Sequence, residues 1–181
     1  MKKNSLRHKA IQYADYALGQ FINKAKTRPY WQDTIFLVVA DHDARALGKE
    51  LVPIKNFHIP GVILNSEKSH FSDERIVSQI DLAPTLLSQM GITNISPMLG
   101  HDLNDPEASG RAMMQYAENF AYMQDDKVTI LQPQKPPSNF TYDFERKILS
   151  PRKLNQSLSD IALAHALWGS LAYENEWYRN K

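Results

Sequence analysis

The sequence predicts an α/β fold in which a mostly parallel sheet is flanked by helices. Two short apolar runs, residues 35–40 and 60–64, are rich in β-branched and aromatic side chains, which is typical of strands buried on both faces. The segment before the first run has a helical period, and loop and helical segments follow each run. Strands that alternate with helices in this way usually form a sheet between layers of helices.

The first helix is predicted to reach about residue 25. Its apolar side chains recur at three- and four-residue steps and so share one face: Ala10, Ala14, Ala17, Leu18, Phe21, Ile22 and Ala25. Pro29 helps to end it, because proline cannot continue the hydrogen-bonding pattern of a helix. The second strand must begin at Pro60, since proline cannot donate to the ladder of a central strand.

A second helix is predicted between Asp81 and Gly91. Asp81 is a typical N-cap, Pro84 is tolerated in the first turn, and Gly91 is a typical stop at the C-terminal end. The helix cap is therefore the expected role of Asp81, in preference to a role as a metal ligand.

The C-terminal third contains weaker signals and one strong one. Residues 127–131 fit an edge strand, and residues 132–139 form a proline-rich loop. A terminal helix is predicted from about Ser157, because Ser157 and Asp160 have the spacing of a capping box. Its apolar stripe includes His165, which we expect to be packed on that face.

Length, composition and charge predict one globular domain, residues 1–181, and narrow the function classes. The chain has 181 residues and a formal net charge of +1, which gives no electrostatic case for nucleic-acid binding. It contains no cysteine, so disulfides and thiolate metal sites are excluded. No uninterrupted apolar run approaches the roughly 18 residues of a membrane-spanning helix.

Asp41 and His42 are the candidate metal site, because they follow the first apolar run directly. In open α/β sheets, ligands bind beyond the carboxyl ends of the strands. Neighbouring side chains can both reach one ion where the strand has turned into a loop. A carboxylate and an imidazole together suit zinc or manganese better than magnesium. The residues alone leave one alternative open, an aspartate that caps the next turn beside a solvated histidine.

The pair lies inside an ordered series of motifs. Residues 34–42 read Thr-Ile-Phe-Leu-Val-Val-Ala-Asp-His, and residues 79–87 read Gln-Ile-Asp-Leu-Ala-Pro-Thr-Leu-Leu. Three shorter motifs accompany them: one before, at residues 13–18, one between, at residues 57–62, and one after, at residues 99–103. In this order and spacing the chain resembles the sulfatase and alkaline-phosphatase superfamily, and most of all the lipoteichoic-acid-synthase-like phosphoglycerol transferases. The likeness covers residues 9–105, and residues 106–181 form a tail.

The resemblance implies the C-terminal portion of an alkaline-phosphatase-like fold. By match of motif, Asp41 and His42 would be two ligands of a catalytic divalent metal such as Mn, Zn, Mg or Ca. The family's nucleophile, a Thr, Ser or formylglycine, and a further acidic ligand lie well upstream of this pair. Residues 1–40 predict one helix and a turn and offer no counterpart to either. No catalytic residue is therefore assigned, and we expect the isolated chain to be inactive.

The resemblance also implies partners and a location. The substrate would be a phosphate or sulfate ester, including a lipid head group, and the missing N-terminal catalytic portion would be a protein partner. Members of the most similar type act outside the cell membrane, with an extracytoplasmic or periplasmic catalytic domain. A chain that lacks its neighbouring portion would leave apolar surface uncovered, so we expect self-association.

Two further residues near the pair have weaker assignments. His58, before the second strand, is a candidate for contact with substrate, although a histidine that bonds the backbone at a strand entrance is the preferred interpretation. Asp43 is expected to be a loop residue, with support of the metal ligands as the alternative. For the whole chain, the enzymatic interpretation has one competitor, a non-catalytic remnant that serves as a binding or interaction module.

Overall fold

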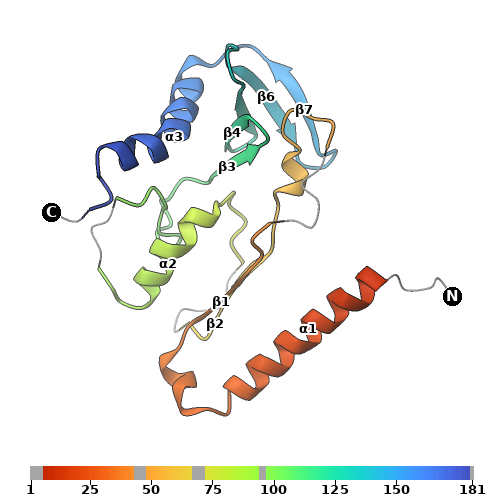
Figure 1. Cartoon of the computed structure of the whole chain (residues 1–181), viewed down its shortest axis with the longest axis vertical. Coiled ribbons are helices and arrows are strands. Elements are labelled where there is room, and N and C mark those ends of the chain that lie inside the picture. Colours follow the sequence, from red (N-terminus) through yellow and green to blue (C-terminus); the bar gives the residue numbers. More distant parts are fainter. Residues whose placement is uncertain (1–5, 43–47, 67–71, 94–96, 180–181) are drawn as a thin grey trace. The chain divides into compact units, whose positions relative to one another are not determined.

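The computed structural model describes residues 6–42, 48–66, 72–93 and 97–179 (Figure 1). It confirms the α/β class, with sheets accompanied by helices. The elements follow one another as α1 (Leu6–Ala25), the 3₁₀ turn η1 (Pro29–Asp33), β1 (Phe36–Val39), η2 (Ile54–Asn56), β2 (Gly61–Leu64), η3 (Gln79–Asp81), α2 (Leu82–Gln89), β3 (Arg111–Tyr116), β4 (Asn119–Gln124), β5 (Lys127–Leu131), β6 (Ser138–Asp143), β7 (Ile148–Arg152) and α3 (Gln156–Glu174).

The described chain forms two compact units, and each is described by itself. The first unit contains α1, η1 and most of β1 and β2, that is residues 6–38 and 62–66. The second unit contains the remaining described residues, from Val39 to Gly61 and from Ser72 onward. The boundary passes through β1 and β2, which pair in a two-stranded sheet.

The first unit is organised around Phe36 at the start of β1. Phe21 from α1 meets the Phe36 ring edge-on, with 6.1 Å between centroids, and Trp31 from η1 stacks on it at 5.2 Å. Asn65 adopts a positive φ of 62° just after β2, and its side-chain amide donates to the carbonyls of Trp31 and Thr34. The end of β2 therefore lies beside the start of β1.

Helix α1 forms where the periodicity predicts it, but its apolar side chains are exposed. Ala25 is the buried residue of the helix, whereas the exposed fraction is 86% for Leu6, 73% for Tyr13 and 62% for Tyr16. Tyr13 and Tyr16, which a helix of this period could have used in a core face, are therefore not part of a core in the described structure. The expectation of uncovered apolar surface is confirmed.

The direction of strand pairing differs from the expected parallel arrangement. The backbone N–H of Ala40 donates to the carbonyl of Pro60 at 3.2 Å, so the carboxyl end of β1 lies beside the start of β2 and the two strands run antiparallel. The strands are also less covered than predicted, with Val39 37% and Val62 48% exposed. An apolar run predicts a strand, but it does not predict whether the neighbouring strand is parallel or antiparallel.

The second unit is built on a five-stranded antiparallel meander, in the order β3-β4-β5-β6-β7. Side chains alternate between its faces, as the period of a strand requires. On one face, strand residues such as Met123, Val128 and Ile130 enclose Val52 and Ile54 from the η2 segment. On the other face α3 covers the sheet, as Figure 1 shows, through a cluster of Tyr122, Leu158 and Ala162.

The sheet corrects one sequence prediction and adjusts another. Strand β5 (residues 127–131) has the predicted bounds but lies in the centre of the sheet between β4 and β6, so the edge assignment is wrong. The proline-rich loop is shorter than the predicted 132–139, because β6 begins at Ser138. The central position arises because β5 pairs with strands on both sides, and those partners are segments that lie elsewhere in the sequence.

The cap of α3 also differs from the prediction. Asn155 is the N-cap, and its side-chain oxygen accepts from the backbone N–H of Leu158 at 3.1 Å. The predicted box of Ser157 and Asp160 is therefore wrong by two positions. His165 packs as expected, with its ring 4.8 Å from that of Tyr122.

Candidate metal site

Asp41 and His42 lie side by side immediately after β1, as predicted. His42 Nε2 is 3.4 Å from Asp41 Oδ2, and the backbone N–H of His42 donates to Asp41 Oδ1 at 2.9 Å. Both side chains face solvent, with exposed fractions of 87% for Asp41 and 72% for His42. The pair thus presents a carboxylate oxygen and an imidazole nitrogen to one open space, which is a donor set that zinc and manganese accept.

The backbone at the pair is held by Gln79, which sequence analysis did not single out. The Gln79 side-chain amide Nε2 donates to the carbonyl of Ala40 at 2.8 Å and to that of Asp41 at 3.0 Å. Gln79 opens the 3₁₀ turn η3, within the same unit as the pair. The signal available in the sequence was its place at the head of the Gln-Ile-Asp-x-x-Pro-Thr motif.

Asp81 occupies the buried centre of that motif. Its carboxylate is 1% exposed and accepts from the backbone N–H groups of Ser78 and His101, each at 2.8 Å. Arg111 from β3 donates to the same carboxylate at 2.9 Å and also to the carbonyl of Leu99. Asp81 marks the N-terminus of α2 as predicted, but its side chain joins three segments instead of capping that helix.

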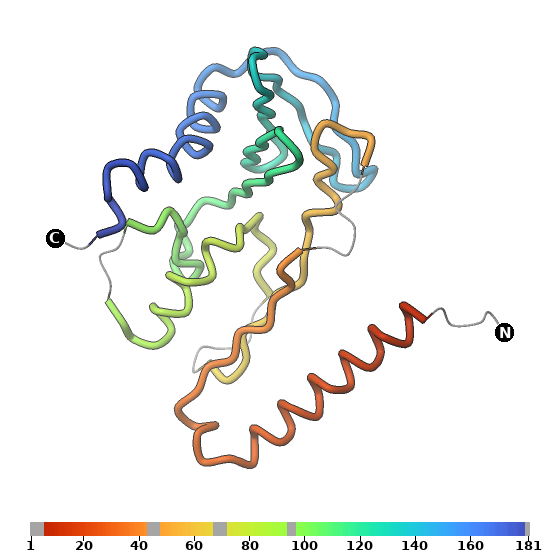
Figure 2. The backbone as a smooth tube through the Cα atoms, in the orientation of Figure 1, coloured from red at the N-terminus to blue at the C-terminus, as the bar shows by residue number. Residues whose placement is uncertain are grey.

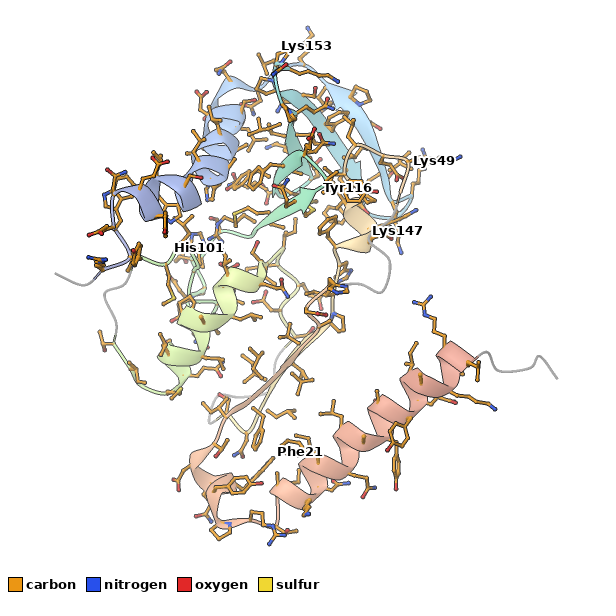
Figure 3. The ribbon with its side chains drawn as sticks, viewed as in Figure 1. Phe21, Lys49, His101, Tyr116, Lys147 and Lys153 are labelled. Atoms are coloured by element: carbon orange, nitrogen blue, oxygen red, sulfur yellow. The ribbon has the colours of Figure 1, made fainter. Side chains whose placement is uncertain are left out.

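The chain beyond the pair is anchored on the antiparallel sheet. Tyr116, labelled in Figure 3, has its hydroxyl 3.3 Å from the backbone of Gly48, and the Asn119 side chain donates to the carbonyl of Leu51 at 2.8 Å. Val52 and Ile54 then enter the core. Figure 2 shows the described part of this path, residues 48–61, which passes through η2 to the start of β2.

His58 lies on the return path, in the connection between η2 and β2. Its side chain is exposed, and it precedes Pro60 by two residues. The Pro60 carbonyl accepts from the backbone N–H of Ala40, the residue before Asp41. His58 therefore lies near the end of the two-stranded sheet that also carries Asp41 and His42. Asp43, the other residue considered near the pair, lies outside the described residues.

Two donors make an incomplete coordination shell. Among residues 6–42, 48–66, 72–93 and 97–179, no group of three or more His, Asp or Glu side chains gathers at metal-binding distance. Catalytic zinc sites use three protein ligands and structural ones four. Asp41 and His42 fit a divalent cation in donor type, and they would need further donors to hold it tightly.

Comparisons with known proteins agree with the sequence motifs. The sulfatase family model matches residues 5–92, a range that includes the pair, His58 and the η3–α2 segment. This match, together with the structural likeness that follows, supports placing the chain in the sulfatase and alkaline-phosphatase superfamily. A crystal structure of an alkaline phosphatase superfamily protein from Vibrio parahaemolyticus is similar over the entire chain, with 46% sequence identity and a TM-score of 0.92.

The superfamily relationship extends past the motifs. The Vibrio structure covers 100% of this chain, so the tail of residues 106–181, which carries no named motif, belongs to the same fold. This chain in turn covers 45% of that structure, less than half of its length. Among the described helices, none has the length and apolar character to cross a membrane.

Proposed function

We propose that this chain forms the C-terminal part of a metal-dependent catalytic domain that acts on phosphate or sulfate esters. The reaction would be hydrolysis or a transfer of the phosphoglycerol or phosphoethanolamine type, as in the lipoteichoic-acid-synthase-like enzymes. The observation that carries the proposal is the adjacency of Asp41 and His42, exposed at the end of β1 within the sulfatase-matched residues. Superfamily membership supports it.

Asp41 and His42 would hold one divalent cation, Mn, Zn, Mg or Ca, through a carboxylate oxygen and a neutral imidazole nitrogen. A cation held there supplies Lewis-acid polarisation of an ester oxygen and lowers the pKa of a nucleophile that touches it. His58, exposed at the same end of the two-stranded sheet, is proposed to contact the substrate. The exposure of the pair leaves room for a phosphate or sulfate group beside a cation held there.

The nucleophile and the remaining metal ligands are proposed to come from the portion that corresponds to the rest of the Vibrio structure. The isolated chain should accordingly show no turnover of aryl phosphate or aryl sulfate above background, since two ligands without a nucleophile cannot attack an ester. For the complete enzyme we propose a lipid head group as substrate and an extracytoplasmic position at the cell membrane.

Calorimetric titration of zinc or manganese tests the metal role. The wild-type chain should bind weakly, and Asp41→Ala should abolish that binding. The matched control Asp33→Ala, which removes the exposed carboxylate at the end of η1, should leave it unchanged. Equal binding by all three proteins would refute the role of the pair. Adding the complementary portion to the wild type should raise the affinity and restore turnover, because its donors complete the shell.

A second candidate, a non-catalytic interaction module, is favoured by the exposed apolar side chains of α1. The two candidates differ in the same complementation experiment. A complex that forms but never turns over an ester, while the isolated chain still associates, would favour the module.

A further inference from the structure

We propose that Gln79 is a positioning residue that sets the geometry of the Asp41–His42 pair, an inference that rests on the proposed metal role of that pair. The Gln79 side-chain amide bonds the main chain on both sides of the Asp41 Cα atom, next to where the two ligand side chains leave it. It acts on the peptide groups that carry them, at 2.8 Å from the Ala40 carbonyl and 3.0 Å from the Asp41 carbonyl.

The two carbonyls bracket the Asp41 Cα atom. One belongs to the peptide group before Asp41 and the other to the group after it, which also contains the N–H of His42. A primary amide has two N–H donors, so one glutamine can hold both carbonyls at once. Fixing both peptide planes fixes the backbone dihedrals of Asp41, and with them the direction in which its side chain leaves the chain and the position of the peptide group from which His42 begins.

This restraint matters because the pair is exposed. With 87% of Asp41 and 72% of His42 open to solvent, side-chain packing contributes little to their orientation. A metal ligand set needs placement within a fraction of an ångström, and the residues that orient ligands influence affinity almost as strongly as the ligands do. Gln79 supplies this orientation from outside the loop that carries the pair.

Gln79 is itself tied to a rigid part of the second unit. Its neighbour Ser78 accepts from the backbone N–H of Asp81 through its side chain, and Asp81 returns the bond to the Ser78 N–H. The Ser78 hydroxyl also accepts from the N–H of Met113 in β3 at 3.2 Å, and Arg111 of the same strand pairs with Asp81. Strand β3 therefore holds η3 in place, and Gln79 at the start of η3 holds the backbone at Asp41 and His42.

The test compares Gln79→Met with Gln115→Met. Methionine keeps the length of glutamine but cannot donate, and Gln115 is a matched control because its side chain donates to the Ala117 carbonyl at 2.8 Å in the same unit. A second variant, Gln79→Asn, keeps the amide but withdraws it by about one bond length, ~1.5 Å. Zinc affinity, thermal unfolding and the backbone order parameters of Asp41 and His42 are measured for each.

We expect both Gln79 variants to bind zinc about tenfold more weakly, the lower end of the effect seen for residues that orient metal ligands. Their unfolding temperatures should stay near that of the wild type, because Gln79 is exposed. Without metal, the order parameters of Asp41 and His42 should fall from rigid values near 0.85 toward about 0.6. Gln115→Met should leave all three quantities unchanged.

The outcomes separate this inference from the proposed function. If the order parameters do not fall in Gln79→Met, the positioning role is overturned, whatever zinc does. If they fall and zinc affinity is unchanged while Asp41→Ala abolishes binding, the metal role stands and the positioning role is overturned. If Asp41→Ala binds zinc like the wild type, the proposed metal role fails, and the Gln79 inference fails with it.

Discussion

Removing the Asp81 carboxylate should be among the most damaging single changes in this chain. Asp81→Ala would leave the Arg111 guanidinium, 4% exposed, without its carboxylate and bonded only through a neutral acceptor, the Leu99 carbonyl. It would also leave the Ser78 and His101 backbone N–H groups without their acceptor. Breaking a buried ion pair from one side costs roughly 3–5 kcal/mol, so we expect a loss of about 4 kcal/mol in the free energy of unfolding.

The reverse change should cost less, because the two sides of the pair are not equivalent. Arg111→Met leaves the Asp81 carboxylate with two backbone N–H donors, and methionine fills the space of the arginine stem. We expect a loss of about 2–3 kcal/mol. The double variant should lose less free energy of unfolding than the sum of the two single losses. With both side chains replaced, no buried charge is left without its partner.

Urea unfolding followed by tryptophan fluorescence measures these differences, because Trp168 and Trp177 both belong to the second unit. A loss below about 1 kcal/mol for Asp81→Ala, or a larger loss for Arg111→Met than for Asp81→Ala, would refute the reasoning. If Asp81→Ala fails to fold in water while the double variant folds, the unpaired buried cation is identified as the cause.

Three further outcomes are expected. Asn155→Ala should destabilise the chain by about 1 kcal/mol in urea unfolding and Ser157→Ala by much less, because Asn155 is the cap. Asp73→Asn should destabilise the chain at neutral pH. The Arg75 side chain lowers the pKa of Asp73, so in paired pH titrations the difference should be complete above about pH 5 and vanish as the pH falls through that lowered pKa. The chain should self-associate in sedimentation experiments, and Tyr13→Ser should weaken the association; an unchanged monomer for both would argue against it.

The sequence by itself determined the features that depend on neighbouring residues. The helical period placed α1, the apolar runs placed β1 and β2, and Gly91 marked the end of α2 with its positive φ of 71°. The adjacency of Asp41 and His42 was also predictable, because both residues follow directly after a strand whose end the apolar run defines. Order and spacing of the motifs then predicted the superfamily.

Tertiary structure decided the features that depend on distant partners. Strand direction, the central position of β5 and the alternating faces of the antiparallel sheet follow from which segments pair, and a local pattern does not contain that information. The burial of Asp81 against Arg111 joins positions 30 residues apart in the sequence, and Gln79 reaches back 38 residues to Asp41. A glutamine or an aspartate in a motif looks the same whether its side chain is solvated or holds other segments in place, because only the folded chain supplies the donors and acceptors that it meets.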